Sequence, residues 1–251
     1  MYTIKFLNGS TKKFSTLVSA NLSGADLSGV NLSGADLSYS DLTGSNLYRA
    51  NLYQVKLIGA NLHKINLTQA NLEHVDLTRA SLIKSKLCQA TIKYCNFYKA
   101  NLEEVNLKQI NLTDSNLNEV NLKRSNLILA FFERTTINNC SLKGSNLEEA
   151  NLAATYLVYV NLTNINLRNT NLEKADLYKV NLSGADLSFA NLKNASLYGS
   201  DLRNTNFTNA NLAGVQLYSA IINKTNFKGA NLEGVNLSEA DWSQSKLGLY
   251  T

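Results

Sequence analysis

The chain has 251 residues, with 24 Lys or Arg against 19 Asp or Glu, so its formal net charge at pH 7 is +5. No stretch is apolar for long enough to cross a membrane, and residues 1–7 do not resemble a signal peptide. Three cysteines do not make a disulfide framework in a chain of this length. We therefore expect a cytoplasmic protein rather than an integral membrane protein or a disulfide-stabilised secreted domain.

The N-terminal segment, residues 1–16, differs in pattern from the rest of the chain. Residues 2–7 are typical of a short strand, and Asn8-Gly9 after them is typical of a tight hairpin turn. Such a segment would cover the open backbone edge of the fold that follows it. We predict that residues 1–16 form an N-terminal capping segment.

From residue 17 to residue 247 every fifth residue is large and apolar, over 47 consecutive positions. All are Leu except Ile92, Phe97, Phe132, Ile137, Phe207, Ile222, Phe227 and Trp242. A period of five would scatter these residues around an α-helix and alternate them between the faces of a flat strand. The chain must instead turn a corner once in each repeat, always in the same sense. Residues 17–247 are therefore predicted to form one continuous solenoid.

The remaining positions of the repeat agree with an enclosed core. The residue two before each apolar one is Ala, Val, Ser, Thr, Ile or Cys at all 46 positions, and it is never charged. The residue just before the apolar one is Asn or Asp at 34 of 46 positions. Lys, Arg, Glu, Tyr and Gly gather at the two positions after it. Two inward and three outward residues per repeat are thus predicted.

Glycine marks the expected corners, because 11 of the 13 glycines stand two residues after the apolar position. A type II turn needs a residue with positive φ, which Gly adopts at little cost. Where Lys64, Lys84, Glu104 or Gln109 replaces this Gly, we expect a type I turn instead. The absence of proline suits stacked strands, since every ladder N–H remains available.

Residues 20–24 (ANLSG), 25–29 (ADLSG) and 185–189 (ADLSF) resemble the A(D/N)LXX consensus of the pentapeptide repeat family. The resemblance covers about nine tenths of the chain. It implies an all-β fold, a right-handed quadrilateral parallel β-helix with four repeats per coil. About 11–12 coils stacked at ~4.8 Å would make a rod roughly 55 Å long.

The solenoid leaves only a short C-terminal tail, residues 248–251. An uncovered terminal edge favours association, and several members of the family dimerise through their C-terminal coil. We therefore predict a homodimer of this kind, with Trp242 and Tyr250 as candidate contacts. The alternative is that Trp242 plugs the end of its own core.

No combination of residues in the sequence indicates catalysis or cofactor binding. His63 and His74 are the two histidines, and they belong to different repeats and fall on different sides of the rod. A general base or a metal site would need a carboxylate or thiol held beside one of them. Cys95 and Cys140 occupy the inward phase, whereas Cys88 is outward and is expected to be a free thiol. We predict that the protein is not an enzyme and holds no cofactor and no metal.

Departures from the repeat consensus point to three surface groups. Tyr178, Tyr198 and Tyr218 share one phase at intervals of four repeats and should form an exposed ladder, which could be purely structural or could bind a partner. Ile128, Leu129 and Phe131 are apolar at positions that are mostly polar, and they form either a contact patch or a locally distorted coil. The third group is a basic side interrupted by Glu103 and Glu104, for which nucleic-acid binding is disfavoured; its cations are Lys64, Lys84, Lys123, Arg124 and Lys143.

These observations favour a non-enzymatic protein-binding or scaffolding solenoid. Its candidate partner-binding residues are Tyr178, Tyr198 and Tyr218, followed by Ile128, Leu129 and Phe131. The resemblance also offers an alternative, a DNA mimic that interacts with DNA gyrase or a topoisomerase as quinolone-resistance proteins do. That activity requires a dense acidic surface, so the basic net charge and the lack of loops disfavour it.

Overall fold

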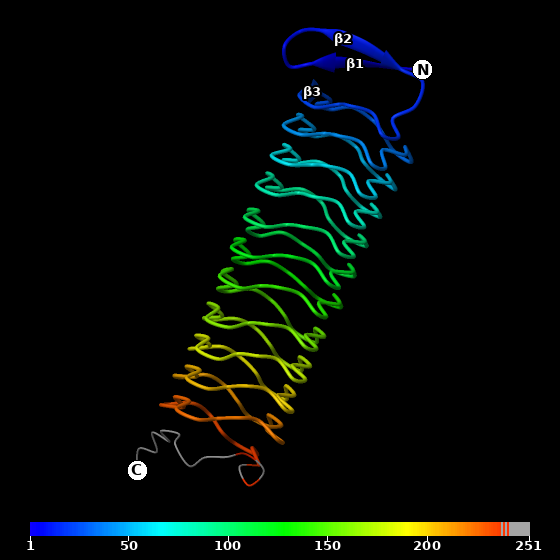
Figure 1. Cartoon of the computed structure of the whole chain (residues 1–251). Helices are drawn as coiled ribbons and strands as arrows, with labels where there is room; N and C mark the ends of the chain where they lie inside the picture. The colour runs from blue at the N-terminus through cyan, green and yellow to red at the C-terminus, as the bar shows by residue number, and fades with distance from the viewer. Residues whose placement is uncertain (237, 239, 241–251) are drawn as a thin grey trace.

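The computed structural model describes residues 1–236, 238 and 240. They form a rod in which short parallel segments stack one above another from the N-terminal end to the C-terminal end (Figure 1). Each residue before the apolar position bridges to its equivalent four repeats later, as in the parallel pairs of Asn21 with Asp41 and of Asp26 with Asn46. Four repeats therefore complete one coil. The predicted right-handed, four-sided β-helix is confirmed.

The four sides and corners recur in every coil and are named here by their first members. Sides 1, 2, 3 and 4 contain residues 21, 26, 31 and 36, each with every twentieth residue after it. Corner A (residues 23 and 24), corner B (28 and 29) and corner C (33 and 34) follow sides 1, 2 and 3. Corner D (residues 38 and 39) joins side 4 to side 1 of the next coil.

A repeat that begins with Asn or Asp can satisfy all five of its backbone N–H groups, as repeat 41–45 shows. The first N–H donates to the preceding coil, the second and fourth donate to the following coil, and the fifth closes the corner turn. The third donates to the side chain of the first residue. The bonds are Asp41 N to Ala20 O (3.0 Å), Leu42 N to Asn61 O (2.7 Å), Thr43 N to Asp41 Oδ1 (3.0 Å), Gly44 N to His63 O (2.9 Å) and Ser45 N to Leu42 O (3.0 Å).

This pattern explains why Asn and Asp precede the apolar residue so often. Their Oδ1 atom accepts the corner N–H that the strand ladder cannot reach, and an Asn amide also donates to the coil before it. On side 3, Asn171 Oδ1 accepts from the backbone N of Glu173 at 3.2 Å, while Asn171 Nδ2 donates to Asn151 Oδ1 at 3.1 Å. The amide column continues through Asn191, Asn211 and Asn231.

The core is one continuous apolar column. The predicted every-fifth residues are buried without exception from Leu17 to Phe227, and the rings of Phe207 and Phe227 stack with centroids 5.4 Å apart. Buried hydroxyls and thiols at the other inward position donate to backbone carbonyls. Ser85 Oγ, for example, donates to Leu62 O at 2.7 Å. Such bonds let a polar group enter the core without an unpaired donor.

Corners that lack Gly do not form the type I turns that we predicted for them. All 44 residues in the Gly phase from 19 to 234 have positive φ, although only 11 of them are Gly. Lys64, Lys84, Glu104 and Gln109 have φ between 56° and 59°, so the type I prediction is wrong there. The N–H of this residue must reach the next coil, and that requirement outweighs the left-handed penalty of about 1–2 kcal/mol.

The N-terminal segment forms a hairpin over the first coil (Figure 1). Strand β1 (Tyr2–Phe6) pairs antiparallel with β2 (Thr11–Phe14) and with β3 (Ala25–Asp26), in the order β2-β1-β3. Leu7 N also donates to Gly24 O at 2.8 Å, and Ile4 is buried against the core. The hairpin thus pairs with backbone at the N-terminal edge of the solenoid. The proposed dimer contacts Trp242 and Tyr250 lie outside the described residues.

Two adjacent alanines test the cost of the corner conformation. Ala154 has a φ of 52°, whereas Ala153, beside it on corner C, is not in the left-handed region. We expect Ala154→Gly to stabilise the protein by about 0.5–1 kcal/mol, because Gly removes the left-handed penalty. The control Ala153→Gly should destabilise it by a similar amount. Urea unfolding measures both, and equal losses of stability would contradict this account of the corners.

The cysteines give a second prediction. Burial raises the pKa of the Cys95 and Cys140 thiols to about 12, whereas Cys88 is half-buried at a corner. The thiolate is the reactive form, so Ellman's reagent should modify Cys88 alone in the folded protein and all three thiols after unfolding. Peptide mass spectrometry would identify the site, and labelling of Cys95 in the folded protein would contradict the buried position.

Candidate functional site

The predicted tyrosine ladder is present on corner D, with Tyr198 and Tyr218 exposed as predicted but Tyr178 half-buried. The ring centroids of Tyr178 and Tyr198 are 5.3 Å apart with the planes inclined at 15°, and those of Tyr198 and Tyr218 are 5.0 Å apart at 16°. Tyr159 continues this column on the N-terminal side with an edge-to-face contact of 5.8 Å to Tyr178. Because the ring faces cover one another, the column presents mainly ring edges and hydroxyl groups to solvent.

A cation lies beside the N-terminal end of the tyrosine column (Tyr159, Tyr178, Tyr198 and Tyr218). Lys179 Nζ is 5.1 Å from the ring centroid of Tyr178 and 5.8 Å from that of Tyr159. Its pKa is raised above the ordinary lysine value, first by its hydrogen bond with Tyr178. Tyr218 at the other end is 47% exposed. The column is therefore an amphipathic strip with a fixed positive charge near one end.

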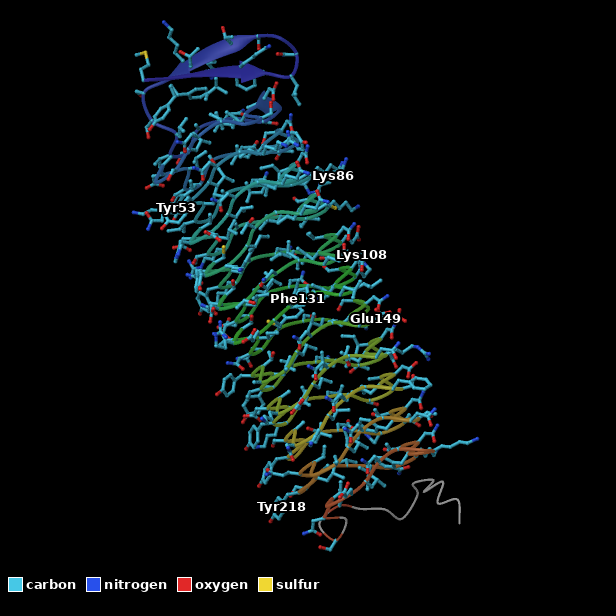
Figure 2. The ribbon with its side chains drawn as sticks, turned by 180° about the vertical axis from the view of Figure 1, so that it is seen from behind. Tyr53, Lys86, Lys108, Phe131, Glu149 and Tyr218 are labelled. Carbon is cyan, nitrogen blue, oxygen red and sulfur yellow. The ribbon has the colours of Figure 1, made fainter. Side chains whose placement is uncertain are left out.

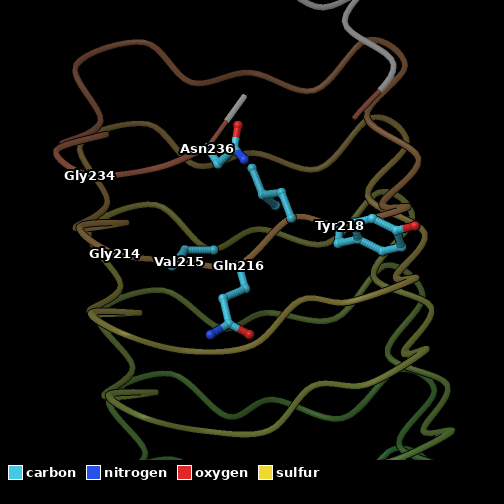
Figure 3. Close-up of a pocket in the computed structure, with 7 residues that line it drawn as sticks. Gly214, Val215, Gln216, Tyr218, Gly234 and Asn236 are labelled. Carbon is cyan, nitrogen blue, oxygen red and sulfur yellow. The ribbon is translucent and has the colours of Figure 1, made fainter. Parts of the chain in front are cut away.

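A shallow recess lies next to the C-terminal end of the tyrosine column (Figure 3). Its volume is about 280 Å³, and no Cβ stands at Gly214 or Gly234 on its rim. The residues that line it are Gly214, Val215, Gln216, Leu217, Tyr218, Gly234 and Asn236. This set contains no carboxylate, imidazole, thiol or amine, so the recess offers no general acid or base other than a phenol.

Ile128, Leu129 and Phe131 lie together on a regular coil, so the alternative of a locally distorted coil is excluded. Phe131 N donates to Ile110 O at 2.9 Å and Leu129 N donates to Glu148 O at 3.0 Å, as in other repeats. Ile128 and Leu129 are half-buried on corner B, and Phe131 is 45% exposed on side 3. Figure 2 shows Phe131 in the middle of this side, with Lys108 and Glu149 along one of its corners.

The predicted basic residues share corner A, but part of their charge is neutralised within the chain. Glu104 lies 3.3 Å from Lys84 and 2.8 Å from Arg124, and Arg124 also pairs with Glu103. Arg124 and Lys84, in that order, lower the pKa of Glu104 through hydrogen bonds. What remains is a local depression of about 440 Å³ lined by Lys123, Arg124, Lys143 and Gly144.

A second aromatic cluster, on corner C, was not predicted. His74 stacks on Tyr94 with centroids 4.9 Å apart and planes at 9°, and it meets Tyr53 edge-to-face at 5.5 Å. His74 and Tyr94 are four repeats apart in one phase, so their contact could have been predicted from the sequence. Tyr53 belongs to the neighbouring phase, and its contact with His74 is evident only in the structure. His63 lies on corner A, away from His74.

Neither a metal centre nor a membrane-spanning helix is present in the described part of the chain. No three of its His, Cys, Asp and Glu side chains are grouped as metal ligands would be. No helix within residues 1–236 is both long and apolar enough to span a bilayer.

Comparison with known proteins places this geometry in a family. The chain matches the model of a pentapeptide repeat region over residues 39–107 and 130–207. It also matches the model of pentapeptide repeats in eight copies over residues 15–54, 95–134, 106–144 and 225–247. A search of curated proteins returned no match.

Three solved structures illustrate the likeness. HetL from the cyanobacterium Nostoc sp. strain PCC 7120, a pentapeptide repeat protein involved in heterocyst differentiation regulation, is 31% identical over 90% of this chain and 91% of its own, with a TM-score of 0.35. QnrB1, a plasmid-mediated fluoroquinolone resistance protein, is 18% identical over 80% of this chain and 89% of its own, with a TM-score of 0.49. Rfr23 from the cyanobacterium Cyanothece 51142 is 26% identical over 58% of this chain and 89% of its own, with a TM-score of 0.18. The family matches, which cover more than half of the chain, show that the chain belongs to the pentapeptide repeat family.

Proposed function

We propose that this protein is a non-enzymatic scaffold that binds a partner protein along the tyrosine column on corner D. The stacked rings of Tyr178, Tyr198 and Tyr218 carry the proposal. Tyrosines are enriched in protein interfaces because each offers apolar area and a hydroxyl with few rotatable bonds. Stacking fixes these side chains before a partner arrives, which lowers the entropy lost on binding.

The surroundings of the tyrosine column support binding rather than chemistry. The recess beside Tyr218 lacks acid–base groups, and the described residues contain no grouped metal ligands. HetL, similar over nine tenths of both chains, is described as acting in regulation. A regulatory protein that works by binding would need the rigid surface found here and no catalytic residues.

The apolar residues Ile128, Leu129 and Phe131 form a second contact surface in this proposal. Phe131 takes a place that Asn occupies on the coils before and after it, at Asn111 and Asn151. A cytoplasmic location is also proposed, because all three cysteines are free thiols, as a reducing compartment would keep them. Gyrase mimicry is not proposed, since this basic chain lacks the dense acidic surface that it requires.

The test compares two triple variants in a pull-down from a lysate of the source organism. In Tyr178/Tyr198/Tyr218→Phe the rings remain stacked, whereas in Tyr178/Tyr198/Tyr218→Ser the column is lost. We expect the Ser variant to lose partners that the native chain retains, and the Phe variant to keep those that depend on ring area. Circular dichroism would establish that both variants keep the native fold. Recovery of the same partners by the Ser variant and the native chain would show that the column is structural.

A further inference from the structure

Side 3 is the most uniform side of the rod, and Phe131 is its only large apolar outward residue among the described coils. From residue 31 to residue 231 the outward position on this side is Asn in every coil except at Thr91 and Phe131. Phe131 cannot accept the corner N–H of Glu133, and it interrupts the amide column between Asn111 and Asn151. A residue that gives up these hydrogen bonds and exposes an aromatic ring suggests a contact from outside the chain.

The charged residues along corner C have a definite order around Phe131. Counting coils from Phe131, Glu73 and Lys93 stand three and two coils before it, and Glu173 and Lys193 stand two and three coils after it. Each side chain is at the first position of its corner, next to side 3. None of the four takes part in an ion pair within the described residues.

When a second rod runs in the opposite direction, the order of its charges along corner C is complementary to that of the first rod. A two-fold axis across side 3 at Phe131 places Lys193 of one copy on Glu73 of the other, and Glu173 on Lys93. Each contact then occurs twice, as a two-fold interface requires. We propose that side 3 is a self-association surface on which a second copy of this chain packs antiparallel, with Phe131 at the two-fold axis.

Corner B supports the same arrangement. Lys108 lies one coil before Ile128 and Leu129, and Glu148 and Glu149 lie one coil after them. The two-fold axis brings Lys108 of each copy toward this acidic pair of the other. Neither Lys108 nor Glu149 has an ion-pair partner within the described part of the chain. Apolar side chains thus lie at the centre, with complementary charges on both sides along the rod.

Like charges meet in one place, at the axis itself. The two Glu133 side chains approach each other there, but each is held by Arg134 of its own chain, with Nη1 2.5 Å from Glu133 Oε1. Arg134 also binds Asp114, with Nε 2.7 Å from Oδ1. One coil away on either side the corner carries the uncharged Thr113 and Ala153. The centre of the surface is therefore not repulsive.

The amide oxygens of side 3 add little to the cost of burial. Asn151 Oδ1 already accepts from Ala153 N at 3.2 Å and from Asn171 Nδ2 at 3.1 Å. Asn111 Oδ1 accepts from Thr113 N at 3.0 Å. An amide oxygen that already accepts needs few new partners when a second copy covers it, whereas the Nδ2 groups of Asn111 and Asn151 have no acceptor among the described residues and need one, or a water, in the interface. Seven coils of one narrow side make a small interface, so we expect dissociation constants in the micromolar range, ~1–100 μM.

Zero-length carbodiimide crosslinking of the full-length protein tests the arrangement directly. Within one rod Glu73 and Lys193 are six coils apart, about 29 Å, so they can be joined only between two copies. We expect a dimer band that contains the Glu73–Lys193 and Lys93–Glu173 crosslinks, together with a concentration-dependent dimer in sedimentation velocity. A monomer at every concentration up to about 1 mM, well above the expected dissociation constant, or a dimer without these crosslinks, would overturn the proposal. A dimer formed solely through Trp242 and Tyr250 would be such a case.

Variants in which the charges of the proposed Lys93–Glu173 contact are reversed test the pairing. Glu173→Lys alone should weaken self-association about tenfold, because two symmetric contacts become repulsive. The double variant Lys93→Glu/Glu173→Lys restores complementary charges and should recover the native dimer. Lys143→Glu on corner A lowers the net charge by the same amount as Lys93→Glu does. It should leave self-association unchanged. Failure of the double variant to recover while Glu173→Lys weakens association would contradict the pairing.

Phe131→Asn separates the interface from the fold. Asn restores the acceptor for Glu133 N and joins Asn111 to Asn151, so the thermal midpoint of the variant should equal or exceed that of the native chain. Self-association should nevertheless fall about tenfold. The proposal specifies the partner of Ile128, Leu129 and Phe131 and does not involve the tyrosine column. The Tyr178/Tyr198/Tyr218→Ser variant should therefore dimerise normally, whereas an unchanged dimer in Phe131→Asn would overturn the proposal.

Discussion

One constraint organises the rod: five backbone N–H groups per repeat must find acceptors while the chain turns a corner in every repeat. The ladder to neighbouring coils takes three of them, and the corner turn takes the fourth. The remaining N–H, that of the third residue of the repeat, has no backbone acceptor, and the Asn or Asp before the apolar residue supplies one, as Asn171 does for Glu173. Because unpaired backbone donors are costly when shielded from water, this side chain supports the solenoid in addition to the apolar column.

Some repeats lack the Asn or Asp, and in two of those that the structure describes the corner N–H finds another acceptor. Thr136 and Tyr156 on side 4 lack the amide acceptor, and the preceding coil supplies it from a different position: Asn138 N donates to Asn118 Oδ1 at 3.0 Å, and Val158 N donates to Asn138 Oδ1 at 3.2 Å. No such substitute serves Glu133 after Phe131 within the described residues. Other exceptions, such as Thr91 and Ser141, also leave the corner N–H without an acceptor in the described part of the chain, so what distinguishes Phe131 on side 3 is the exposed aromatic ring and not the lost hydrogen bond alone.

Much of this arrangement could be predicted from the sequence, because a repeat fixes every phase at once. The burial of every fifth residue from Leu17 onward followed from the period alone. The stacking of Tyr178, Tyr198 and Tyr218 could be predicted from their spacing once the family resemblance supplied four sides. The corner turns at Lys64 and Lys84 were predicted wrongly, since residue preference favours one turn and the inter-coil hydrogen bond requires another. The function of the Asn phase was missed because it depends on a corner N–H whose direction the sequence does not state. The limits 1–16, 17–247 and 248–251 stay predictions.

Amide hydrogen exchange measured by NMR tests the central claim at two matched lysines. Lys123 and Lys143 are exposed at equivalent positions of corner A on adjacent coils. Lys123 N donates to Asn121 Oδ1 at 3.2 Å, whereas Ser141 precedes Leu142 and Lys143 N has no acceptor among the described residues. The account predicts that the Lys123 amide exchanges about tenfold more slowly than that of Lys143 and that Ser141→Asn removes the difference. Equal exchange in the native protein would contradict it.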